Sequence, residues 1–448
     1  MNLNDTIVAC ATKVSRQAIS IIRLSGEQSI DIVNKIVGKK LDQENKMQLR
    51  KIYDGKDIID ESLILTFVEG KSFTGENVVE IQCHGGILLT NKIISLLISN
   101  GARPALPGEF SQRAYLNGRI NLIQAESINN LIDSKNELAL KLNALNLEGK
   151  NNKALLDMKK DLIVLISKIQ TSIDYPDYDD VEGSSAEEIS QELDKLQKEV
   201  MKILEASKRF NYLNSGINTL ILGETNVGKS SLLNSLISEE KAIVTDVEGT
   251  TRDIVEGQLN FENFTLNLID TAGIRNTEDK VEQIGIEKSI SLINTSNLIL
   301  FVINKGKINY EIYEKIRDKK HLVVLNKIEL LSEQEIKEIQ KEFKDLILIS
   351  AINGDIKNLI NKIEEEFNNG DLLETEVPLL SNAFHIEMFK NILTLLENCS
   401  RNISDGFTTD LINVDLYEIL KILNNLLGIY DADEEVIDNI FRKYCLGK

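Results

Sequence analysis

The chain has 448 residues, of which 42% are hydrophobic and 27% are charged, which is the composition of an ordinary globular protein with about three domains. Its net charge of −19 argues against a protein that holds nucleic acid over its whole surface, because such affinity comes largely from Lys and Arg. No apolar stretch approaches the ~20 residues of a membrane span, no signal peptide is recognisable and the four cysteines are scattered, so we expect a cytoplasmic protein with reduced thiols.

Residues 1–117 combine strand and helix patterns. Segments rich in β-branched and apolar residues predict strands at 5–12, 18–25, 62–68 and 78–83. Helical spacing follows at 26–37 and 86–99, and two of the four prolines lie in the turn-rich segment 103–108. We therefore predict an N-terminal α+β domain over 1–117.

From residue 118 onward the pattern becomes helical, with helices expected within 120–173 and 186–212. Residues 214–368 then alternate short apolar runs with amphipathic helices, which is typical of a parallel α/β sheet. The strands are expected at 217–222, 264–269, 298–303, 322–325 and 346–349, and helices return at 382–402, 410–427 and 433–443. The simplest interpretation is a helical domain in two halves, 118–213 and 373–448, with an α/β domain over 214–372 inserted between them.

The sequence Gly223-Glu-Thr-Asn-Val-Gly228-Lys229-Ser230 follows a predicted strand and opens a predicted helix, the context that supports a P-loop. Its glycines let backbone amides face phosphate oxygens, and the helix N-terminus adds positive potential. We expect Lys229 to reach the β- and γ-phosphates and the Ser230 hydroxyl to bind Mg²⁺.

Further polar elements follow the P-loop in a fixed order. Thr251, within Gly249-Thr250-Thr251-Arg252-Asp253, offers a second hydroxyl for Mg²⁺, and Asp270-Thr271-Ala272-Gly273 ends a predicted strand. Asn326-Lys327-Ile328-Glu329 and Ser350-Ala351 end two more strands. This set resembles the small-GTPase superfamily, a Ras-like α/β fold that reads guanine with Asn-Lys-x-Asp, so we expect guanine recognition with Glu329 in place of Asp. The predicted GTP-binding residues are Gly223, Asn226, Val227, Gly228, Lys229, Ser230, Ser231, Thr245, Asp246, Val247, Glu248, Gly249, Thr250, Thr251, Asp270, Thr271, Ala272, Gly273, Asn326, Lys327, Glu329, Ser350, Ala351 and Ile352.

The residue after Gly273 is Ile274, where Ras-like enzymes place a Gln that orients the attacking water. Another group must then do this work. Asn226 resembles the Asn of GTPases that bind K⁺ between the phosphates, although an Asn also fits a tight turn. Glu282 is a candidate for orienting the water, although an acidic residue early in a helix is also favoured by the helix dipole.

Motifs along nearly the whole chain resemble one family, the MnmE (TrmE) GTPases that modify the wobble uridine of tRNA. The matching segments are Asp5-Thr6-Ile7-Val8-Ala9, Ile22-Arg23-Leu24-Ser25-Gly26, Phe73-Thr74-Gly75-Glu76, Val79-Glu80-Ile81, His84-Gly85-Gly86, Pro107-Gly108-Glu109-Phe110, Leu116-Asn117-Gly118, Asp270-Thr271-Ala272-Gly273-Ile274-Arg275, Glu282-Gln283-Ile284-Gly285-Ile286-Glu287 and Tyr444-Cys445-Leu446-Gly447-Lys448.

The resemblance implies functions that the residues alone do not. In this family the N-terminal domain binds a formyl-tetrahydrofolate and forms a homodimer. Matching positions imply a folate site of Arg23, Glu80, Arg119 and Lys448, with Arg119 where Lys is usual. They also imply a K⁺ site formed by Asn226, Thr245, Val247 and Thr250, and catalytic roles for Lys229, Glu282 and Cys445. A buried, inert Cys445 is the alternative.

The family also implies partners. A flavin- and NADH-dependent protein, MnmG (GidA), joins the homodimer in a heterotetramer that acts on tRNA. Together they install a carboxymethylaminomethyl or aminomethyl group at C5 of the wobble uridine, with glycine or ammonium as the nitrogen source and 5-formyltetrahydrofolate, or a related folate, as the carbon source. GTP hydrolysis would open and close paired G domains. The acidic chain agrees with a partner that carries much of the tRNA contact.

Three other functions remain open on the sequence. A ribosome-assembly GTPase of the Era or Der type would carry a basic RNA-binding module or a second G domain, and this sequence contains one P-loop motif. A non-catalytic nucleotide-dependent scaffold fits if Glu282 and Glu329 have no part in turnover. A folate-dependent one-carbon transferase acting on a small molecule would use the N-terminal domain alone.

Overall fold

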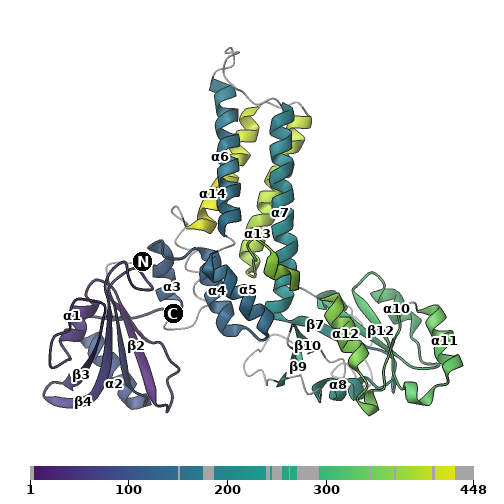
Figure 1. Ribbon diagram of the computed structural model, residues 1–448, viewed down its shortest axis with the longest axis horizontal. Helices are drawn as coiled ribbons and strands as arrows, with labels where there is room; N and C mark the ends of the chain where they lie inside the picture. The colour runs from purple at the N-terminus through teal and green to yellow at the C-terminus, as the bar shows by residue number, and fades with distance from the viewer. Residues whose placement is uncertain are drawn as a thin grey trace, which may run out of the picture. The chain divides into compact units, whose positions relative to one another are not determined.

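The structure is a computed structural model that describes residues 5–149, 152–174, 186–238, 243–244, 255–261, 263–269, 292–343, 345–367, 370–405 and 409–428 (Figure 1). It divides into two compact units, one of Met1–Asn129, Asn146–Lys198 and Met388–Lys448, the other of Asn130–Leu145 and Glu199–Glu387. None of the helices in the described ranges is both long and apolar enough to cross a membrane.

A six-stranded sheet with strand order β3-β4-β5-β2-β1-β6 begins the first unit. Its strands are β1 (Ile7–Cys10), β2 (Ile19–Ser25), β3 (Lys46–Asp54), β4 (Asp57–Phe67), β5 (Val78–His84) and β6 (Arg103–Pro104). The pairs are antiparallel except for β1 with β6. The helices α1 (Ser29–Asn34), α2 (Ile87–Ser99) and α3 (Glu109–Leu116) accompany this sheet.

Alternation along the strands gives this sheet two different faces. Ile22, Leu24 and Ile81 point to one face, where they pack with apolar residues of α1 and α2. Arg23 and Glu80 alternate with them and therefore lie on the other face. There the ring of Phe110 on α3 packs with buried residues of β1. One face thus forms the domain core, and the other carries charged side chains.

A buried ion network joins the start of this domain to α3. The Arg113 side chain is fully buried, and its guanidinium binds the carboxylates of Asp5, Glu76 and Glu109 at 2.6–3.2 Å. Arg103 adds a second cation to Asp5 and Glu109. Burial works against ionisation of Asp5, but hydrogen bonds from the two arginines outweigh it and lower its pKa. The charges are therefore paired rather than solvated, which is the condition for burying them.

Helices make up the rest of the described part of the first unit and some of the second. They are α4 (Leu122–Asp133), α5 (Glu137–Glu148), α6 (Asn152–Asp174), α7 (Ala186–Ser215), α13 (Ala383–Ser404) and α14 (Thr409–Leu427). In the first unit α6 and α14 pack together, with the Asn413 amide donating to Gln170 at 2.8 Å, and Gln197 of α7 donates to Ser400 of α13 at 2.9 Å (Figure 1). Residues 120–173, predicted as broadly helical, contain three separate helices.

The second unit contains a seven-stranded sheet with strand order β13-β12-β11-β7-β10-β9-β8. The strands are β7 (Ile217–Leu222), β8 (Ile243–Val244), β9 (Val255–Asn260), β10 (Thr265–Ile269), β11 (Leu298–Ile303), β12 (His321–Leu325) and β13 (Ile347–Leu348). The five predicted strands are parallel to one another. The two unpredicted strands, β8 and β9, add an antiparallel edge.

Helices cover both faces of this sheet, as its apolar strands require. Every residue of β11 is buried, with Leu298, Leu300 and Val302 on one face and the alternate residues on the other. The first face packs on α8 (Lys229–Ile237) and α12 (Lys357–Glu366), and the second on α10 (Tyr310–Ile316) and α11 (Glu333–Glu342). The described part of this unit also contains three short 3-10 segments: η2 (Ile328–Leu330), η3 (Ala351–Asn353) and η4 (Gly370–Glu374). The result is a three-layer α/β fold with loops at the carboxyl ends of its parallel strands.

Among the strands absent from the prediction, β3 and β9 are the longest, and they are less uniformly apolar than the predicted strands. β3 is an edge strand with three basic residues and exposed Met47 and Leu49. A usable signal was present, because Gly55 follows Asp54 in the two-residue turn to β4, and its φ is +61°. β9 carries Gln258 and Gly257, which hide its strand character from an apolar pattern.

Candidate functional site: a nucleotide-binding loop

The predicted P-loop joins the end of β7 to the start of α8. Gly223 and Gly228 have φ values of +149° and +100°, and Asn226 has a φ of +62°. A Cβ at Gly223 would lie 2.1 Å from the Val302 carbonyl oxygen, so the loop passes too close to β11 for any side chain there. Gly228 is the N-cap of α8 and no side chain caps the helix, so its first amides face outward as an anion site requires.

Lys229, the first residue of α8, folds back over this loop. Its ammonium nitrogen donates to the carbonyl oxygens of Gly223 at 2.9 Å and Glu224 at 2.7 Å. Ser230 follows on the exposed side of the first helical turn. An ammonium and a hydroxyl beside uncapped amides are the donors that a Mg²⁺-bound phosphate needs, so this end of the site fits a nucleotide.

Asn326 joins the P-loop to the loop after β13, and its side chain is 1% exposed. Its amide nitrogen donates to the Val227 carbonyl oxygen at 3.0 Å, and its amide oxygen accepts from the Ala351 backbone nitrogen at 3.0 Å. A Cβ at Gly228 would lie 2.2 Å from that amide nitrogen, which explains the second glycine of the motif. Three predicted nucleotide-binding segments are therefore held together by one side chain.

Lys327 and Glu329 follow on the same loop. Lys327 has a φ of +63°, and its ammonium donates to the Asn226 carbonyl oxygen at 2.9 Å. Glu329 lies in η2 with an exposed side chain. Ile352, in η3, is 78% exposed. The Glu329 and Ile352 side chains are available at the surface, and within the described ranges Glu329 makes no hydrogen bond or ion pair with the P-loop.

The Ser350 hydroxyl also fits a ligand site. Ser350 is 3% exposed, and its oxygen is buried with no hydrogen-bond partner among the described residues. Its backbone exchanges hydrogen bonds with Asp355, which holds the turn in place. A buried polar atom without a partner is costly unless a ligand or water satisfies it. This supports the predicted placement of Ser350, Ala351 and Ile352 beside a nucleotide.

The first half of the P-loop is contacted by two residues that were not predicted from the sequence. The Asn309 amide donates to Glu224 Oε1 at 2.7 Å, and the Lys307 ammonium donates to the Thr225 carbonyl oxygen at 3.3 Å. Both residues lie in the connection from β11 to α10, and Asn309 is the N-cap of α10. An Asn before a predicted helix is a recognisable capping signal, but its P-loop partner lies 85 residues away in the chain.

The predicted folate-site residues that the structure describes lie in the first unit. Arg23 and Glu80 are direct partners in the β2–β5 ladder, and the Arg23 guanidinium donates to Glu80 Oε1 at 2.8 Å. Their side chains are 23% and 16% exposed, and the guanidinium lies 5.7 Å from the centroid of the Phe110 ring. The stem of Arg119 lies near Gly75, and Asn117 donates to the Thr74 carbonyl oxygen. A carboxylate, a guanidinium and a ring fit the polar edge and flat face of a pterin.

Several predicted site residues fall outside the described ranges. They are Thr245, Asp246, Val247, Glu248, Gly249, Thr250, Thr251, Asp270, Thr271, Ala272, Gly273, Glu282, Cys445 and Lys448. The described cysteines, Cys10, Cys83 and Cys399, are buried free thiols. Burial raises the pKa of Cys83 to about 11 and that of Cys399 to about 12, so neither supplies a thiolate near neutral pH.

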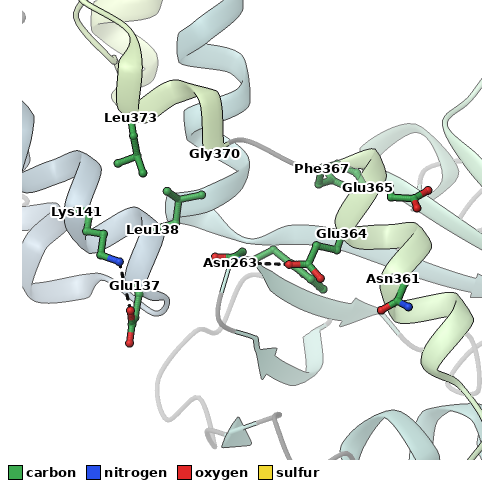
Figure 2. Close-up of a pocket in the computed structure, with 11 residues that line it drawn as sticks. Glu137, Leu138, Lys141, Asn263, Asn361, Glu364, Glu365, Phe367, Gly370 and Leu373 are labelled. Atoms are coloured by element: carbon green, nitrogen blue, oxygen red, sulfur yellow. Dashed lines mark hydrogen bonds and ion pairs between the residues drawn. The ribbon is translucent and has the colours of Figure 1, made fainter.

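A separate hollow of about 480 Å³ lies between α5, α12 and the β9–β10 turn (Figure 2). Glu137, Glu364 and Glu365 line it, with Lys141 paired to Glu137 and Asn263 donating to Glu364 at 2.8 Å. The hollow adjoins the beginning of β10, whereas the P-loop follows the end of the parallel strand β7. Three carboxylates disfavour a phosphate, so this hollow is a poorer candidate for the nucleotide than the P-loop.

Known proteins resemble this chain along its full length. Residues 6–119 match the model of the GTP-binding protein TrmE N-terminus, and residues 122–445 match the MnmE helical domain. The tRNA modification GTPase MnmE of Mycoplasma mycoides is 51% identical over 453 residues, covering 100% of both chains. The proteins of the same name from Mesoplasma florum and Streptococcus thermophilus are 51% and 38% identical, covering 100% and 99% of this chain and 100% and 98% of their own.

One of the similar solved structures is the G domain of the T. maritima FeoB iron transporter. It is 22% identical to this chain, and the match covers 34% of this chain and 98% of that G domain with a TM-score of 0.26. At that score the likeness carries no argument. The two family models together cover most of the chain, and full-length relatives agree with them. The chain therefore belongs to the MnmE (TrmE) family of tRNA modification GTPases.

Proposed function

We propose that this chain is a K⁺-stimulated GTPase that, as a homodimer with the flavin- and NADH-dependent partner MnmG, modifies C5 of the tRNA wobble uridine. The coarser part, a GTP hydrolase of tRNA modification, rests on family membership. The observation that carries it is the Asn326 side chain, which ties the P-loop to the segments expected to read guanine. A loop that only donates hydrogen bonds to phosphate would bind any nucleoside triphosphate. The contact of Asn326 with both segments supports a site that also recognises the base.

Different residues of the chain have different roles in the proposed hydrolysis. The amides of the first turn of α8 and the Lys229 ammonium stabilise charge on the phosphates, exchanging the loop carbonyls for phosphate oxygens. Ser230, with Thr251, would hold Mg²⁺, which neutralises the phosphate oxygens. Asn226, with Thr245, Val247 and Thr250, would hold K⁺. Glu282 would accept a hydrogen bond from the attacking water, because Ile274 cannot.

The second half of the proposal concerns the N-terminal domain. Arg23 and Glu80 lie together on the charged face of its sheet, beside the Phe110 ring, and these groups would orient a tetrahydrofolate with help from Arg119 and Lys448. The bound folate would supply the carbon that is transferred to uridine. Cys445 is proposed to act in the modification chemistry. A carboxymethylaminomethyl or aminomethyl group at C5 is the expected product.

One experiment separates the GTPase from the alternatives. We expect GTP turnover to be several-fold faster in K⁺ than in Na⁺, because a bound cation replaces an arginine finger. Asn226→Ala should remove the difference, and Lys229→Ala should abolish turnover in both salts. Equal rates in both salts for the unaltered protein would contradict the K⁺ site. Turnover by Lys229→Ala at the normal rate would contradict the P-loop assignment itself.

Deletion of the gene provides the test of the tRNA product. Mass analysis of wobble uridines should show the C5 modification missing, and restored by the intact gene but not by the Lys229→Ala gene. Intact modification in the deletion strain would instead favour the ribosome-assembly or small-molecule alternatives.

A further inference from the structure

The P-loop is held from two sides in the structure. Asn326 and Lys327 bind the carbonyl oxygens of its second half, at Val227 and Asn226. The connection from β11 to α10, residues 304–309, binds its first half at Glu224 and Thr225. The first set belongs to the guanine-reading segment already described. The second set has no assigned role.

Asn309 is well placed to hold the loop because both ends of its amide are engaged. Its oxygen accepts from the Ile312 backbone nitrogen at 3.0 Å and so caps α10. Its nitrogen donates to Glu224 Oε1 at 2.7 Å. The cap fixes the amide on a rigid helix, and the remaining donor faces a charged acceptor, which makes a stronger hydrogen bond than a neutral pair.

Glu224 transmits this contact to the phosphate site. Its side chain is bound by Asn309, and its own carbonyl oxygen accepts from the Lys229 ammonium at 2.7 Å. Both contacts fall on one residue, so the hydrogen bond from Asn309 restrains the part of the loop whose carbonyl oxygen binds Lys229. The Lys307 ammonium at the Thr225 carbonyl oxygen holds the next peptide of the same loop.

We propose that Asn309 and Glu224 form a clamp that positions the first half of the P-loop for nucleotide binding. This inference rests on the proposed GTPase site. Both are positioning residues, because each acts on the nucleotide through the loop and Lys229. The clamp preorganises the loop, so its loss slows nucleotide capture or hastens release without removing a phosphate ligand.

The capping role of Asn309 can be separated from the clamp by choice of variant. Asn309→Asp keeps an oxygen that caps α10, since Asp is as good an N-cap as Asn, but places a second carboxylate opposite Glu224. Glu224→Gln combined with Asn309→Asp restores the contact with donor and acceptor exchanged. Lys305→Ala is the matched control, because Lys305 lies in the same connection but pairs with Glu335.

The dissociation rate of a fluorescent GDP analogue is the main measurement, with kcat, KM for GTP and the melting temperature on the same proteins. We expect Asn309→Asp to release the analogue about tenfold faster and to raise KM more than it lowers kcat, as loss of a contact to a charged group predicts. The double variant should return to within about twofold of the unaltered protein, and Lys305→Ala should not differ from it.

Release by Asn309→Asp at the unaltered rate would overturn the clamp. A double variant that releases as fast as Asn309→Asp would also overturn it, because the defect would then lie in α10 and not in the pair. If Asn309→Asp lowers the melting temperature, recovery in the double variant still decides. Failure of the GTPase proposal is a different result: the unaltered protein would bind the analogue but not hydrolyse GTP.

Discussion

Glu329 is the residue at which this chain departs from the usual guanine-reading motif. Its side chain is exposed in η2, two residues after Lys327, which has the left-handed conformation. Glu carries the same two acceptor oxygens as Asp on a side chain one methylene longer. The exposed position leaves room for that extra length, because no buried neighbour must repack around it.

We predict that Glu329→Ala weakens GTP binding by about 1–3 kcal/mol, because guanine donors lose their acceptor. Glu329→Asp should keep or improve the affinity. Titration calorimetry with GTP, and with inosine triphosphate as the control, measures this. Inosine lacks the guanine amino group, so its affinity should change less. Normal GTP binding by Glu329→Ala would place guanine recognition on Asn326 and Ser350 alone.

Among the elements, α11 shows how local sequence alone builds a stable terminus beside the site. Ser332 and Glu335 form a reciprocal capping box, in which the serine hydroxyl accepts from the Glu335 backbone nitrogen and the carboxylate accepts from the Ser332 backbone nitrogen. Lys305 adds an ion pair to the same carboxylate. Hydrogen bonds from Lys305 and then from Ser332 lower the pKa of Glu335 to about 2.

We predict that Ser332→Ala lowers the free energy of unfolding by about 1 kcal/mol, with exposed Gln334→Ala in the same turn as the control. Glu335→Gln tests the charge. Because the folded pKa of Glu335 is lowered, its stabilisation is present above its ordinary pKa of 4.5 and is lost as the pH falls toward 2. Glu335→Gln should therefore destabilise at pH 7, and most of the difference should be gone near pH 2. Denaturant unfolding at both pH values measures this, and a difference that persists in acid would contradict the pKa argument.

For the whole molecule, the net charge of −19 sets a limit on how the chain handles tRNA. Long-range repulsion opposes a polyanion, so a local basic surface or a partner must supply the phosphate contacts. We predict that the chain alone binds tRNA weakly, and that affinity rises at least tenfold when MnmG is added. Filter binding at two salt concentrations measures this. Tight binding by the chain alone at high salt would contradict it.

Local sequence pattern is enough to predict those parts of this protein that depend on short-range interactions. The predicted bounds of β7 and β11 agree with the structure because β11 is apolar and buried throughout, and β7 combines Ile217 with the buried apolar run Leu220–Leu222. The P-loop is equally recognisable, because Gly223 and Gly228 have positive φ values and leave no room for a Cβ atom, so only glycine fits. Strands β3 and β9 were missed because their mixed composition does not form an uninterrupted apolar run.

Which distant residues share a site depends on how the strands pair and pack. The register of β2 and β5 places Arg23 opposite Glu80, which lies 57 residues later in the chain. The pairing of β7 with β11 brings Glu224 to Asn309, which lies 85 residues later. No local pattern encodes either pair, because each contact follows from which strands lie side by side in the sheet. The buried Ser350 hydroxyl likewise became informative only when its surroundings were known. Chain pattern identifies the motif, and packing of separate segments determines what holds it in place.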